Sequence, residues 1–200
     1  MGHEETGRGA PRGSRPGFGS AGIELPRERL SVFYPLLQRG VEVLADLGGP
    51  LKELLCGQFG IDEEYVTGRI TTIFLDNRPV DDLERTLIHE GARVTLSAAM
   101  PGLVGATMRR SGFYAAFRQG ISHEEEGGEL QAGEGVIRLK LFNLLLPELG
   151  PLILGRGVIL HPEQVEVLRN RLAGGSDIPA APAGVAGDSR RVLLKVTCTG

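Results

Sequence analysis

Residues 92–110 have the sequence ARVTLSAAMPGLVGATMRR, and we expect the rest of the fold to be arranged around them. Residues 92–98 alternate between apolar and polar side chains and predict a strand. A turn of small residues follows, in which Pro101 and Gly102 permit a sharp change of chain direction. A short apolar segment then ends at Arg109 and Arg110. No other part of the chain combines a strand, a glycine-rich turn and paired positive charge in so few residues.

This stretch predicts a site for an anion. Glycines in the turn allow the backbone to expose its N–H groups, and a helix over residues 103–110 would add a favourable dipole. The two guanidinium groups that follow can form paired hydrogen bonds with a carboxylate or a phosphate. The predicted ligand-binding residues are Ser97, Gly102, Gly105, Arg109 and Arg110. The alternative is a tight structural turn that leaves both arginines in solvent.

The clearest strand lies further along the chain. Residues 136–142, VIRLKLF, alternate regularly, so that three apolar side chains face the core and two basic ones face outward. The inward residues are Ile137, Leu139 and Leu141, and the outward residues are Arg138 and Lys140. Strands are also predicted at 69–75, 112–118, 158–160 and 190–197, with turn chemistry at 76–79.

Helices are predicted on both sides of these strands. Residues 27–47 carry apolar side chains at helical spacing, with Pro35 as a kink or a starting point. A short helix is expected at 50–59, and Pro162 opens a last helix that runs to residue 172. The apolar segment 144–154 is broken by proline and glycine, and we expect it to wrap an edge of the core.

The fold class that follows is α+β, with N-terminal helices packed on a mostly antiparallel sheet, then a C-terminal helix and a tail strand. Residues 1–24 are predicted to be a disordered tail because glycine dominates them. Residues 25–172 form a single domain, 173–189 a flexible linker and 190–200 a terminal strand. That strand could pair with its own sheet or with another chain.

One segment resembles a known domain. Ile73–Val80 is similar to the opening hairpin of the β-grasp sulfur-carrier and ubiquitin-like domains, and Gly91–Leu96 to a later strand. The chain departs from that pattern at Ala92, where the domains have an acid, and at its last residues, Thr199-Gly200, which lack a Gly-Gly tail. We therefore assign no family from it.

Composition narrows the functional classes. The net charge of −3 and the aromatic content of 5% give no support for nucleic-acid binding. No apolar run approaches the roughly 18 residues of a membrane span, and we expect no membrane partner and a cytoplasmic location. Cys56 and Cys198 are expected to be reduced thiols. No cofactor is expected.

Two acidic segments could hold a metal ion. His123 precedes Glu124–Glu126 and could bind a metal ion together with them. Consecutive residues cannot all point at one ion, however, so we interpret residues 122–135 as a solvated loop without metal. Asp81 and Asp82 are interpreted as a helix or turn cap in preference to a metal or acid–base pair.

The sequence has no G-x-x-x-x-G-K-[ST], G-x-S-x-G or H-E-x-x-H motif and no G-x-G-x-x-G after a predicted strand, and the catalytic residues are unknown. The predicted function is a non-catalytic cytosolic accessory or binding domain for an anionic small molecule or a protein partner. The alternative is a small enzyme that acts on a phosphorylated or carboxylated metabolite through residues 97–110.

Overall fold

The computed structural model describes residues 18–99, 102–110, 112, 132–172 and 191–199, and shows an α+β fold. Eight strands in these segments form one sheet in the order β1-β8-β7-β2-β6-β5-β3-β4. The sheet is mixed, because the pairs β1–β8 and β5–β6 are parallel and the other neighbours are antiparallel. The strands are β1 (Gly19–Pro26), β2 (Val41–Leu47), β3 (Thr72–Leu75), β4 (Arg78–Pro79), β5 (Arg93–Ser97), β6 (Gly133–Phe142), β7 (Val158–Leu160) and β8 (Val192–Thr199).

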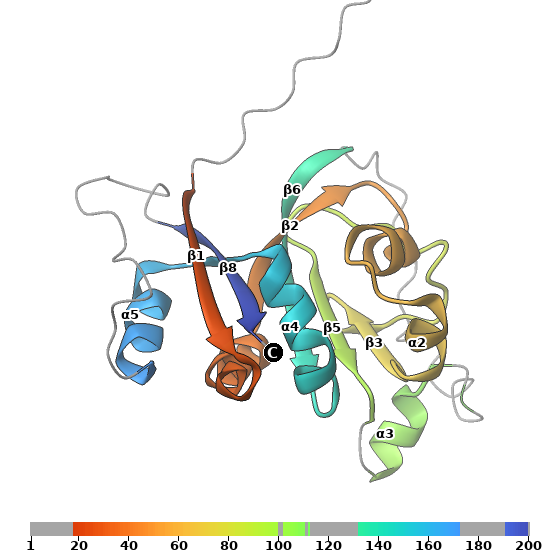
Figure 1. Cartoon of the computed structure of the whole chain (residues 1–200). Coiled ribbons are helices and arrows are strands. Elements are labelled where there is room, and N and C mark those ends of the chain that lie inside the picture. Colours follow the sequence, from red (N-terminus) through yellow and green to blue (C-terminus); the bar gives the residue numbers. More distant parts are fainter. Residues whose placement is uncertain (1–17, 100–101, 111, 113–131, 173–190, 200) are drawn as a thin grey trace, which may run out of the picture.

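The helices connect these strands and cover the sheet. Figure 1 shows α4 crossing in front of the sheet, with α2 and α3 beside β3 and β5 and with α5 beside β1. The helices are the 3-10 helix η1 (Arg27–Phe33), α1 (Tyr34–Arg39), the π-helix η2 (Glu53–Gln58), α2 (Glu63–Gly68), α3 (Gly102–Met108), α4 (Leu145–Arg156) and α5 (Pro162–Arg171).

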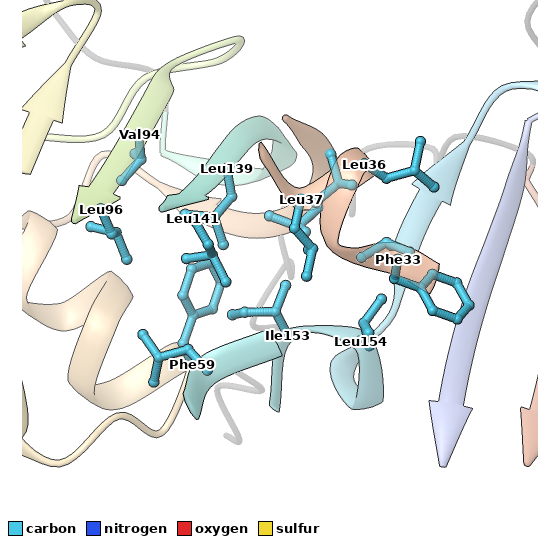
Figure 2. Close-up of a cluster of buried hydrophobic side chains, with 14 of the residues drawn as sticks. Phe33, Leu36, Leu37, Phe59, Val94, Leu96, Leu139, Leu141, Ile153 and Leu154 are labelled. Carbon is cyan, nitrogen blue, oxygen red and sulfur yellow. The ribbon is translucent and has the colours of Figure 1, made fainter. Parts of the chain in front are cut away.

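One hydrophobic core lies between the helices and the covered face of the sheet. Figure 2 shows Leu139 and Leu141 of β6 beside Val94 and Leu96 of β5, opposite Ile153 of α4. All five side chains are at most 1% exposed. Phe33, Leu36, Leu37, Phe59 and Leu154 complete the labelled part of the cluster. Burial of this apolar surface is the main force that holds the helices on the sheet.

The prediction for β6 is confirmed. Its burial alternates along the strand, with Ile137, Leu139 and Leu141 buried and Arg138 exposed. The turn after β3 is also confirmed, since Asp76 has a φ of 50°, in the left-handed region that Asp and Asn tolerate. The hairpin of β3 and β4 is the segment that resembles the β-grasp opening hairpin.

The expected order of elements is not confirmed, because a strand leads the chain. Residues 19–24, which we predicted to be part of a disordered tail, form most of β1. They do so because Ala21, Ile23 and Leu25 are buried and because β1 pairs along its whole length with β8. The terminal strand β8 therefore lies inside the chain's own sheet, between β1 and β7.

The helix predicted over 27–47 is correct only in its first part. Gly40 ends α1 with a φ of 105°, and the chain continues as β2. The segment 144–154 was expected to wrap an edge, but from Leu145 onward it belongs to the twelve-residue helix α4, which has Pro151 inside it. The linker 173–189, the strand predicted at 112–118 and the acidic loop before residue 132 lie outside the described residues, apart from Gly112.

Candidate functional site

Ser97 stands at the end of β5, where it holds the turn that follows. Its side chain is 3% exposed, and its Oγ donates a hydrogen bond to the carbonyl of Ala99 at 3.1 Å. Asn143, just after β6, donates from Nδ2 to the same Oγ at 3.2 Å. Both polar functions of the hydroxyl are therefore used inside the protein. This predicted ligand-binding residue has a structural role.

The two predicted glycines lie in α3. Gly102 is exposed, begins the helix and has a φ of 76°, a conformation that favours glycine. Gly105 is buried inside the helix, one turn further on.

Arg110 follows α3 and connects it to two other elements. Its backbone N–H donates to the carbonyl of Thr71 at 2.8 Å, and its Nη2 donates to the carbonyl of Val66 at 2.7 Å. Val66 belongs to the last turn of α2, so the guanidinium satisfies a carbonyl that a helix end leaves without an internal partner. Burial lowers the pKa of Arg110, and the nearby Asp81 carboxylate acts in the opposite direction.

Arg109 and Arg110 line one groove with a volume of about 380 Å³. We call it the arginine groove. Its lining comes from the region of η2, from α2, from the residues just before β3, from the 81–84 turn and from the two residues that follow α3. The residues are Lys52, Cys56, Glu63, Val66, Thr67, Gly68, Ile70, Thr71, Asp81, Leu83, Glu84, Arg109 and Arg110.

The charges in the arginine groove are partly paired. The Lys52 ammonium lies 2.8 Å from a carboxylate oxygen of Glu63 and 2.9 Å from one of Glu84. The hydrogen bond with Glu63, followed by that with Glu84, raises the pKa of Lys52 and keeps it charged. Arg109 and Arg110 are the other two cations among the described lining residues.

The hydroxyl and thiol groups of the groove are not activated for catalysis. Thr67 donates its Oγ1 hydrogen to the carbonyl of Glu63, and Thr71 donates to that of Ala98 at 2.8 Å. Burial raises the pKa of the Cys56 thiol, which disfavours the nucleophilic thiolate. Both cysteines, Cys56 and Cys198, are free thiols. The arrangement can bind a ligand but offers no paired base and nucleophile in the described lining.

The structure thus brings together two of the five predicted site residues, Arg109 and Arg110. Lys52, which shares the groove with them, gave no local signal, and Asp81 was noted only as part of the cap formed with Asp82. Asp82 acts as the expected cap, since its Oδ1 accepts from the backbone N–H groups of Glu84 at 2.9 Å and Arg85 at 3.1 Å.

Two further observations concern metals and membranes. Within the described ranges, no group of three or more His, Cys, Asp or Glu side chains is placed to hold a metal ion. His123 and Glu124–Glu126 lie outside those ranges. None of the described helices is long and apolar enough to span a membrane.

Comparison of the chain with family models, with curated proteins and with solved structures found no match.

Proposed function

We propose that the protein is a non-catalytic cytoplasmic binding domain that holds a small anionic molecule, a carboxylate or a phosphate, in the arginine groove. The observation that carries the proposal is that Arg109 and Arg110, adjacent in the sequence, line the same groove. Guanidinium groups present several N–H donors in a fixed plane, which suits the oxygens of carboxylate and phosphate. A protein partner that inserts an acidic side chain would use the same chemistry.

The size of the groove agrees with a small ligand. Its volume of about 380 Å³ lies at the lower end of the range of roughly 300 to 1,000 Å³ for small-molecule pockets. Arg109 is an exposed residue, whereas Arg110 is half-buried and anchored on Val66. We assign Arg109 to capture of the ligand and Arg110 mainly to positioning of the groove wall.

The lining favours binding over catalysis. Histidine is not among the described residues of the groove, and its acids Glu63, Asp81 and Glu84 are exposed. A general base needs a pKa near neutrality, which burial of a carboxylate or a histidine usually provides. A small enzyme acting on a phosphorylated or carboxylated metabolite is therefore the less supported alternative.

The test is a thermal-shift titration of the full chain with inorganic phosphate and with citrate. We expect both anions to raise the melting temperature of the wild type, and Arg109→Ala to weaken binding about tenfold, which corresponds to about 1.4 kcal/mol. Arg171→Ala removes an exposed arginine outside the groove and should respond like the wild type. The proposal is wrong if neither anion stabilises the wild type, or if Arg109→Ala responds equally.

A further inference from the structure

A second group of arginines lies on the face of the sheet that points away from the hydrophobic core. Arg93 of β5 and Arg138 of β6 are direct partners in the parallel ladder, and Arg138 is in turn opposite Glu42 of β2. Their neighbours Val94, Leu139 and Val43 are buried in the core, so the three charged side chains point away from it. Adjacent strands are about 4.8 Å apart, which places the two arginine stems side by side.

These side chains border a hollow with a volume of about 440 Å³. We call it the sheet-face hollow. Arg191, just before β8, contributes a third guanidinium from the other side of Glu42. The full lining is Glu42, Glu90, Gly91, Arg93, Val136, Ile137, Arg138 and Arg191.

The acids of this region are already bound. Glu42 lies 3.0 Å from Nη1 of Arg191 through Oε2, and 3.5 Å from Nε2 of His161 through Oε1. Glu90 accepts a hydrogen bond of 3.0 Å from the backbone N–H of Val136. Neither Glu42 nor Glu90 forms an ion pair with Arg138, although the Glu90 carboxylate keeps its charge.

Arg138 itself has an exposed guanidinium that makes no hydrogen bond or ion pair with any residue the structure describes. Its stem is nevertheless held in place, because it packs over Gly40. A Cβ atom built on Gly40 would lie 3.0 Å from Cγ of Arg138 and 3.1 Å from its Cδ. The absence of a side chain at Gly40 therefore leaves the space that the arginine stem fills.

Two like charges directly opposite each other in a ladder destabilise a sheet. The side chain of Arg93 has one weak contact, 3.5 Å from Nε to Oδ1 of Asp76, and Arg138 has none in the described residues. A dianion between the two guanidinium groups would remove the repulsion and use donors from both. A tetrahedral phosphate has the charge and the number of oxygens for two guanidinium forks, whereas one carboxylate has neither.

We propose that the sheet-face hollow is a second binding site, separate from the arginine groove, for the phosphate dianion of inorganic phosphate or of a phosphate monoester, held by Arg93 and Arg138. Arg93 and Arg138 are both exposed residues, so either form of the group can reach them. Glu90 opposes binding through its charge and sets the strength of the site.

The experiment follows the Nε–Hε signals of the arginines by ¹⁵N NMR on the full chain. Inorganic phosphate, methyl phosphate and acetate are the three titrants. We expect saturable shifts at Arg93 and Arg138 with the phosphates and weaker ones with acetate. Tighter binding of methyl phosphate would identify a monoester as the ligand, and tighter binding of inorganic phosphate would identify the free ion.

Matched variants separate this site from a general effect of charge. Arg138→Ala should weaken phosphate binding at Arg93 about tenfold, the effect expected for loss of one charge-assisted contact. Lys140→Ala, on the same strand and the same face, should not. Glu90→Gln should tighten binding, since it removes a negative charge and keeps an oxygen that can accept from Val136.

Phosphate binding in the sheet-face hollow should not depend on the arginine groove. Arg109→Ala should leave the shifts at Arg93 and Arg138 unchanged even if it abolishes those near residue 109. The proposal fails if phosphate gives no saturable shift at Arg93 and Arg138, if acetate binds as tightly, or if Lys140→Ala weakens binding as much as Arg138→Ala.

Discussion

The imidazole of His89 and the carboxylate of Asp76 form an ion pair, with Nε2 of the histidine 2.8 Å from Oδ2 of the aspartate. Nδ1 of the same ring lies 2.9 Å from the carbonyl of Glu90. A carbonyl and an ionised carboxylate can only accept, so these two contacts favour the imidazolium form, in which both ring nitrogens carry a proton. Oδ1 of Asp76 accepts from the backbone N–H of Arg93 at 3.0 Å. The pair thereby ties the β3–β4 turn to the start of β5.

This pair predicts a dependence of stability on pH. Burial acts to lower the pKa of His89, but the hydrogen bonds with Glu90 and Asp76 outweigh it and raise the pKa above 6.5. The stabilisation is therefore complete below pH 6.5 and is lost as the pH rises through the raised pKa. We expect the free energy of unfolding, measured in urea, to decrease over that range by about 0.5 kcal/mol, because the ring is partly exposed to solvent.

The contribution of Asp76 to stability depends on pH in the opposite direction. Burial acts to raise the pKa of Asp76, but the N–H of Arg93 and the ring of His89 lower it below 3.8 overall. Its contribution is therefore present at neutral pH and lost as the pH falls through the lowered pKa. His89→Gln should abolish the loss of stability above pH 6.5. An unchanged pH profile in this variant would exclude His89 as its origin.

The strand β6 gives a prediction about burial. Leu139 is fully buried between its ladder partners Val41 and Val94, so Leu139→Asp places a charge in the core and should unfold the protein. Lys140→Asp, one residue later on the other face, should cost less than about 1 kcal/mol. Circular dichroism measures both. Equal damage would show that the two residues do not face opposite sides.

Local sequence patterns correctly predicted those parts of the fold whose structure does not depend on residues far away in the chain. The alternation in β6 and the Asp76-Asn77 turn depend on short-range chemistry, and both are present. The helix predicted over 27–47 extended too far because Val41 satisfies helical spacing and strand alternation equally well. The deciding residue was Gly40, whose positive φ ends the helix.

Long-range pairing explains the other differences. The glycine-rich composition of residues 19–24 indicates disorder, but Ile23 pairs with Val196 of β8, a partner that no local window contains. Prediction of the candidate site from local sequence was incomplete for the same reason. Arg109 and Arg110 carried a visible signal, whereas Lys52, just before η2, lines the groove where it pairs with Glu63 of α2. Ser97 was visible as a polar residue at a strand end, but its hydroxyl is used internally.

The contact of Arg110 with α2 changes what a substitution should do. From sequence alone, removal of both Arg109 and Arg110 would be expected to leave stability nearly unchanged. Because Nη2 of Arg110 donates to the carbonyl of Val66, we expect Arg110→Ala to cost about 1 to 2 kcal/mol in the free energy of unfolding. Arg109→Ala, at an exposed position, should cost less than about 0.5 kcal/mol. Urea denaturation of both variants tests the difference, and an equal cost would contradict it.

The backbone of Gly40 supports both the end of α1 and the position of Arg138. Its φ of 105° is strained for any residue with a side chain, and a Cβ atom there would press against Arg138 and Lys140, whose Cγ atoms are 3.0 and 3.1 Å away. Gly40→Ala should therefore lower the free energy of unfolding by more than about 1 kcal/mol. Gly22→Ala in β1 is the matched control, because nothing lies within 4 Å of its added Cβ. It should be neutral or slightly stabilising, since alanine restricts the unfolded chain.

Gly40→Ala should also displace the stem of Arg138 and shift its Nε–Hε signal, which Gly22→Ala should not do. If both variants unfold at the same urea concentration, Gly40 is not the strained end of α1, and the space over it does not position the arginine.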